Sequence, residues 1–179
     1  PVSTLQYAPT ILPDEPIENY VSSQPTSAWL ADDANAQSVQ FLYTRYFIVA
    51  ALGAGLARSS LAEPAPAQIE VPIEQLFKPQ PAANGGMGDA HRPALLSGSL
   101  RIGELRYFYV CNPPPGTPVD MNLKETCRAA RVLSTQVQDG ARYEFWSDGQ
   151  WVPELERATP VLPSAGASVT VLPNAYLHK

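Results

Sequence analysis

The stretch ARYEFWSDGQWVP at residues 141–153 decides the fold class of this 179-residue chain. Aromatic residues stand in short runs on both sides of Ser-Asp-Gly, and Asp-Gly is a pair that tight hairpin turns prefer. Aromatic side chains also suit the pleated, half-buried surface of a strand. The stretch therefore predicts a β-hairpin with Tyr143, Phe145 and Trp151 on its short strands.

The β-pattern continues on both sides of this hairpin. Leucine and isoleucine surround one expected turn, near Gly98 or Gly103, and RYFYVC follows at 106–111. Three successive aromatic residues in that run predict a strand with aromatic surface on both faces. Further along, ASVTVLP at 167–173 alternates and predicts a last strand.

We therefore expect an α+β fold, in which residues 94–179 form a small β-rich domain of sandwich-like or barrel-like shape. One helix is expected inside it at 122–138, because Asn122 can cap it and Glu125 stands at the capping-box position. A strand over RVLSTQV at 131–137 is the alternative.

The nineteen prolines are unevenly distributed. They gather in residues 1–25, 64–93, 113–118 and 153–173. Proline fixes φ, removes a backbone donor and disfavours helix at the preceding residue. The proline positions therefore predict compact elements joined by extended segments. Extended segments cannot satisfy their own backbone groups, and we expect them to be disordered or to lie on another surface.

A second helix is expected over residues 31–62. Acidic residues at 32–33 suit its N-terminus, and apolar residues from 39 to 50 recur at three- and four-residue steps. Small residues four apart, Val49, Gly53 and Ala57, predict a close contact with another helix, or a core helix under a tight sheet. The apolar run at 46–57 is too short to span a bilayer, which needs about twenty residues.

Residues 63–93 are expected to be a linker. IEVPI at 69–73 alternates like a strand, but Pro72 confines it to the edge of a sheet.

Residues 1–30 are expected to form an extended, proline-rich arm. A solvated tail is normally poor in aromatic and aliphatic residues, whereas this segment has many. We interpret them as anchors that bind a partner protein, with an arm folded back on its own domain as the alternative. The anchors are Leu5, Tyr7, Ile11, Leu12, Ile17, Tyr20 and Trp29.

Two cysteines, Cys111 and Cys127, flank a proline-rich segment. A disulfide between them would add about 3 kcal/mol of stability in the chain-entropy estimate. No charged leader with an apolar core precedes them, so synthesis in the cytoplasm without a cleaved leader is expected, and with it two reduced, half-buried cysteines. The disulfide is the alternative.

The charge balance excludes several function classes. The net charge is −5, and the twelve Lys and Arg residues form no basic stripe, so direct nucleic-acid binding is not expected. Only 16% of residues are charged, against roughly 25% in average chains. We expect part of the surface to be covered by neighbouring subunits.

No motif for catalysis, a cofactor or a metal is present. SAGAS at 164–168 lacks the G-x-S-x-G pattern, and the Cys and His residues have no zinc spacing. We therefore expect no enzyme and no cofactor.

The leading hypothesis is a structural subunit of a large homo- or hetero-oligomeric assembly. A bacteriophage virion protein made in the host cytoplasm, such as a head decoration, connector or tail component, fits best. One alternative is a membrane-associated or periplasmic accessory subunit with the cysteines oxidised. Another is a carbohydrate-binding β domain in which Trp146 and Trp151 stack on a sugar ring.

Overall fold

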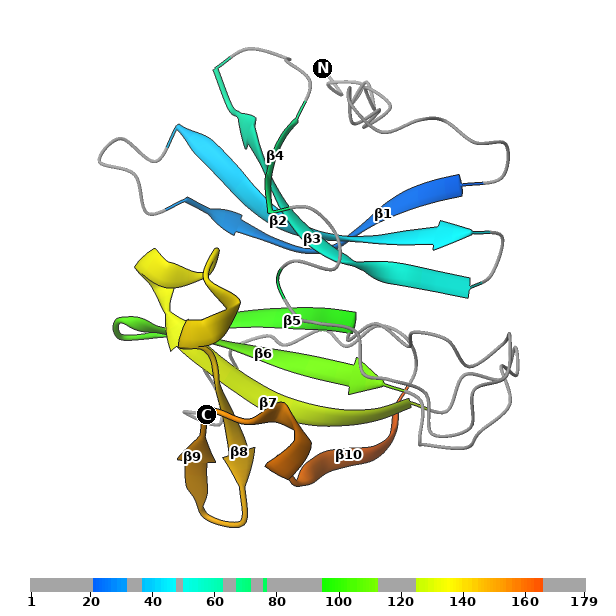
Figure 1. Cartoon of the computed structure of the whole chain (residues 1–179). Coiled ribbons are helices and arrows are strands. Elements are labelled where there is room, and N and C mark those ends of the chain that lie inside the picture. Colours follow the sequence, from blue (N-terminus) through cyan, green and yellow to red (C-terminus); the bar gives the residue numbers. More distant parts are fainter. Residues whose placement is uncertain are drawn as a thin grey trace, which may run out of the picture.

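The computed structural model describes 21–31, 37–47, 50–62, 67–71, 76, 95–112 and 125–165. These residues form ten strands in two antiparallel sheets, drawn as separate layers in Figure 1, and three short 3₁₀ turns. None of the helical turns in the described residues exceeds three residues. The β-rich part of the expected fold is confirmed, and its α part is wrong.

The first sheet has four strands in sequence order. They are β1 (Val21–Leu30), β2 (Ser38–Phe47), β3 (Ala50–Ser60) and β4 (Gln68–Val71). The last ten residues of the expected arm are thus an edge strand of this sheet. β4 is the opposite edge strand and ends before Pro72, as the sequence predicts.

The second sheet has six strands, with β7 at its branching point. The strands are β5 (Leu95–Ile102), β6 (Leu105–Asn112), β7 (Glu125–Leu133), β8 (Glu144–Ser147), β9 (Gln150–Val152) and β10 (Pro160–Ala165). β8 and β10 pair with successive parts of β7, opposite residues 130–131 and 125–128. The 3₁₀ turns are η1 (Ser134–Gln136), η2 (Gly140–Arg142) and η3 (Leu155–Arg157).

One core joins the two sheets. Leu56 of β3 and Leu96 and Val110 of the second sheet are fully buried in the same apolar cluster. Trp29 packs edge-on against Phe108, with ring centroids 5.7 Å apart. Burying this apolar surface supplies the main attraction between the sheets.

Two large polar side chains in the core, Arg106 and Tyr143, make hydrogen bonds there. Arg106, 4% exposed, donates to the Ser99 hydroxyl at 2.9 Å, and its guanidinium lies 4.6 Å from the Trp29 ring centre. The Tyr143 hydroxyl donates to the Val137 carbonyl at 2.7 Å. Burial raises the pKa of Tyr143, and the positive charge of Arg106 opposes this in part.

The helix expected over 31–62 is wrong, because β2 and β3 pair along their whole length. Tyr43 lies directly opposite Gly55, and a Cβ at Gly55 would meet the Tyr43 ring at 2.6 Å. The small residues of β3 therefore make room for an aromatic ring on the neighbouring strand.

The expected helix contact changes accordingly. Gly53 lies in β3 opposite Arg45, and Ala57 is fully buried in a second cluster with Tyr43 and Ala67. Val49 lies outside the described residues. Ala57 therefore packs between strands of a sheet.

The helix expected over 122–138 is also wrong. β7 covers Glu125–Leu133 and is followed by η1, so the alternative strand is right only as far as Leu133. Cys127 and Ala130 are both fully buried although they point to opposite faces of the strand. Small apolar residues on both faces gave the strand a helix-like spacing.

The hairpin that decided the fold class is confirmed. β8 and β9 pair around Asp148 (φ 44°) and Gly149 (φ 96°), which both adopt the left-handed conformation of a tight hairpin turn. Tyr143 lies just before β8. The β5–β6 turn falls at Gly103 (φ 63°). The strand expected at 167–173 lies outside the described residues.

Gly55→Val tests the contact between Gly55 and the Tyr43 ring. Valine favours strands, so a stabilised protein is expected if no ring is in the way. With the ring there, we expect the free energy of unfolding to fall by about 1–3 kcal/mol in urea titrations. Ser60→Val, at the exposed end of the same strand, is the control and should change stability little.

Candidate functional site

The second sheet has a face that the core does not use. Along β6, Arg106, Phe108 and Val110 are buried on the core side. Alternation along a strand places Leu105, Tyr107 and Tyr109 on the opposite side, which we call the outer face. The register extends this face across β7, β8 and β9.

Five outer-face side chains make contact with one another and form what we call the aromatic cluster. They are Tyr107, Arg131, Glu144, Trp146 and Trp151. Tyr107 is opposite Arg131, Arg131 is opposite Glu144, and Trp146 is opposite Trp151. The cluster therefore follows from strand register, although its members are up to 44 residues apart in sequence.

The Trp151 ring is held on three sides. The Arg131 guanidinium lies over the ring at 4.4 Å from its centre. The rings of Tyr107 and Trp146 meet it edge-on, with centroids 5.9 and 5.4 Å away. Edge-to-face and cation–π contacts each favour one ring orientation, so the indole is positioned before any ligand arrives.

The charges of the aromatic cluster cancel. Arg131 Nε donates to Glu144 Oε2 at 2.7 Å, with side chains 25% and 46% exposed. A half-exposed ion pair of this kind adds little stability, but it removes net charge from the surface around Trp151. The cluster is therefore aromatic, electrically neutral and half-buried.

The hairpin that carries both tryptophans is held by hydrogen bonds to residues 157 and 159. Thr159 N donates to the Trp146 carbonyl at 2.9 Å, and the Thr159 hydroxyl donates to Asp148 Oδ1 at 3.0 Å. The Ser147 hydroxyl donates to the Arg157 carbonyl at 2.7 Å. These bonds tie the turn to the segment that follows η3 and restrain the hairpin.

Next to the aromatic cluster lies a second, aliphatic part of the outer face, which we call the aliphatic row. Ile102 is opposite Leu105, and Leu105 is opposite Leu133. Ile102 is 58% exposed and Leu133 is 39% exposed. Leu105 of the row and Tyr107 are two residues apart on β6, so the aliphatic row and the aromatic cluster are neighbours on the outer face.

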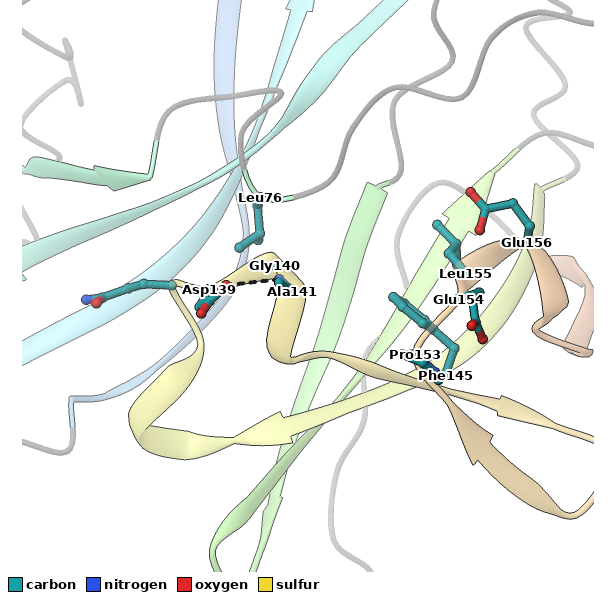
Figure 2. Close-up of a pocket in the computed structure, with 10 residues that line it drawn as sticks. Leu76, Asp139, Gly140, Ala141, Phe145, Pro153, Glu154, Leu155 and Glu156 are labelled. Carbon is teal, nitrogen blue, oxygen red and sulfur yellow. Dashed lines mark hydrogen bonds between the residues drawn. The ribbon is translucent and has the colours of Figure 1, made fainter.

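A cavity of about 670 Å³ lies elsewhere, between η2 and η3. Figure 2 shows Leu76 and Asp139 on one side and Phe145, Leu155, Glu154 and Glu156 on the other. Asp139 accepts a hydrogen bond from Ala141 N and pairs with Arg142, and Glu154 pairs with Arg157. Its carboxylates do not converge on one point, as acid–base catalysis on a bond would need.

The part of the chain that the structure describes has neither a cluster of metal-ligating side chains nor a membrane-spanning helix. No group of three or more His, Cys, Asp or Glu side chains there could hold a metal. None of its helices has the length and hydrophobicity to span a membrane.

The expected arm anchors divide into two groups. Trp29 is engaged within its own chain, because its ring packs on Phe108 and its Nε1 donates to Gln40 Oε1 at 3.1 Å. This agrees with the alternative of an arm folded back at that point. The remaining anchors lie outside the described residues: Leu5, Tyr7, Ile11, Leu12, Ile17 and Tyr20.

Cys111 and Cys127 are joined by a disulfide, against the expectation of two reduced thiols. They are opposite each other on β6 and β7, and both are fully buried. Alternation along β6 and β7 places the disulfide on the same side of the sheet as Tyr107, and the bond joins these two strands there. Disulfides persist mainly outside the cytoplasm, including on virion and cell surfaces.

The sequence indicated part of this site. Aromatic runs in the sequence indicate Tyr107, Trp146 and Trp151, but no local pattern indicates Arg131, Glu144 or the aliphatic row. These residues become neighbours only through the β6–β7–β8 register, which the expected helix at 122–138 concealed.

Comparison with protein-family models gives no match, and none of the curated proteins matches the chain.

The Cys111–Cys127 bond should carry about 3 kcal/mol of the free energy of unfolding, as its loop length implies. Urea titration with and without a reductant measures this for the wild type. The double variant Cys111→Ala/Cys127→Ala is the control, since its unfolding midpoint should be the same with and without the reductant. Two free thiols in the intact mass after alkylation would contradict the bond.

Proposed function

We propose that this protein is a non-enzymatic structural subunit of a larger assembly that docks on a protein neighbour through its outer face. The observation that supports this most is the exposed aliphatic row beside the aromatic cluster. A sheet normally leaves one face polar when that face is in water. Contiguous apolar surface on a second face is characteristic of interaction sites.

The composition of the outer face favours a protein as the neighbour. Tyr, Trp and Arg are the residues most enriched among interface hot spots. Exposed isoleucine and leucine gain free energy when another apolar surface covers them, at about 25 cal/mol per Å² buried. The low charge of the chain, with 16% charged residues, fits a surface that is partly covered.

Docking by the face is favoured over docking by a strand edge. β1 has a bulge at Pro25, β4 ends before Pro72, and β9 is three residues long and ends before Pro153. β10 contains two prolines, and β5 has a register shift at Gly98. Proline, bulges and short edge strands all oppose the addition of a further strand.

Within this proposal, a bacteriophage virion component remains the leading assignment, as a head decoration, connector or tail protein. The disulfide supports an oxidising location such as a particle surface. A periplasmic accessory subunit shares that support. The anchors in residues 5–20 would provide a second docking element.

Ile102→Asp tests the docking surface. Introduced into the native producer, it should release the chain from the large assembly, because a charge in an apolar contact costs about 2 kcal/mol or more. The measurement is sedimentation of the chain on a density gradient.

Leu61→Asp is the matched control, because Leu61 is 57% exposed and lies after β3 of the other sheet, against 58% for Ile102. It should leave sedimentation unchanged. A wild type that sediments as free chain, or an Ile102→Asp variant that sediments with the wild type, would refute docking through this face.

A further inference from the structure

We propose that the cavity between η2 and η3 binds a linear diamine, a molecule with two ammonium groups joined by an apolar stem. The volume of the cavity, about 670 Å³, falls within the range of small-molecule sites. The cavity is separate from the outer face, because Phe145 in its lining points to the core side of β8 and Trp146 points to the outer side. The inference goes beyond the proposed function, and either can stand without the other.

Two short segments form opposite walls of this cavity. Residues 138–141, where η2 begins, line one wall, and residues 153–156, where η3 begins, line the other. Asp139 belongs to the first wall and Glu154 and Glu156 belong to the second. Figure 2 shows Phe145 between the two walls. The carboxylates of the lining are therefore divided between two sides.

The lining is negatively charged. Its described residues include three carboxylates and no lysine, arginine or histidine. Arg142 pairs with Asp139 at 3.5 Å, and Arg157 pairs with Glu154 at 3.3 Å. The two arginine side chains are 63% and 58% exposed, and ion pairs as exposed as these add little stability. Because a carboxylate has about four lone-pair positions, it accepts a donor from a ligand as well.

Ammonium groups are the ligand chemistry that suits these carboxylates. A hydrogen bond from an ammonium to a carboxylate is charge-assisted and roughly twice as strong as one between neutral groups. An anion would be repelled by the lining and by the net charge of −5 of the chain. A neutral ligand would lack the attraction between opposite charges. The lining therefore favours a cation.

The division of the carboxylates favours two cations on one ligand. An ammonium bound at Asp139 leaves the wall of Glu154 and Glu156 unused, whereas a diamine brings one ammonium to each wall. Between the walls the lining is apolar, with Leu76 and Phe145 buried and Leu155 half-buried. A methylene stem between the two ammonium groups is covered by these side chains and leaves water.

The test titrates the full chain with the unbranched diamines from 1,3-diaminopropane to 1,8-diaminooctane. The measurement is calorimetry in a low-salt buffer, in which attraction between exposed charges is least screened. We expect saturable binding of at least one diamine, with a Kd at or below about 10 mM. It should bind at least about fivefold more tightly than the monoamine with the same number of carbons, because only the diamine contacts both walls.

Two variants each remove the charge of one wall. They are Asp139→Asn and the double variant Glu154→Gln/Glu156→Gln, and all three positions are exposed. Asparagine keeps an oxygen that can accept the hydrogen bond from Ala141 N, so the start of η2 is retained. In each variant we expect the diamine to bind no more tightly than the monoamine.

Glu104→Gln is the matched control, because it removes the same charge from the exposed β5–β6 turn, outside the cavity. It should leave the Kd of the diamine unchanged, as should Ile102→Asp, which tests the proposed function. No saturable diamine binding, an equal Kd for diamine and monoamine, or an equal effect of Glu104→Gln and the wall variants would overturn the diamine site. None of these results would bear on docking by the aliphatic row.

Discussion

The structure depends on a single constraint: the central strands of the second sheet carry apolar side chains on both of their faces. Phe108, Val110 and Ala130 fill the core on one side, and Tyr107 and its neighbours occupy the other. Only one of these faces can be covered by the first sheet. The other face is covered in part by the Trp151 ring and remains partly exposed.

Proline and glycine residues determine which surfaces of this molecule are available for contact with another protein chain. Edge strands are blunted by a bulge at Pro25 and by the prolines that follow β4 and β9, so backbone pairing with another chain is opposed. Inside the first sheet, Gly55 gives room to the Tyr43 ring and lets a second cluster form behind the main core. The proposed docking therefore relies on side chains of a sheet face.

Local sequence predicted the turns well and the long strands poorly. Asp148-Gly149 must adopt positive φ in a tight hairpin, and that requirement is visible in two residues. By contrast, β2 has Leu42 in the main core and Tyr43 in the second cluster, so its apolar residues do not alternate. A strand buried on both sides can mimic helical spacing, and only pairing partners distant in sequence resolve it. For the same reason the tryptophans were found from the sequence, whereas Arg131 and Glu144 required the register of β7 and β8.

The two ends of the outer face differ in chemistry, and this difference has a physical consequence. Ile102 and Leu133 have no polar group among themselves, so water leaves them readily and any apolar protein surface can cover them. Around Trp151, by contrast, the Arg131–Glu144 pair places charged groups beside the rings, and covering this part of the face costs free energy unless those groups keep hydrogen-bond partners. Purely aliphatic surface and mixed aromatic and charged surface thus lie side by side on one sheet, which the Cys111–Cys127 bond and the β8–β9 hairpin support.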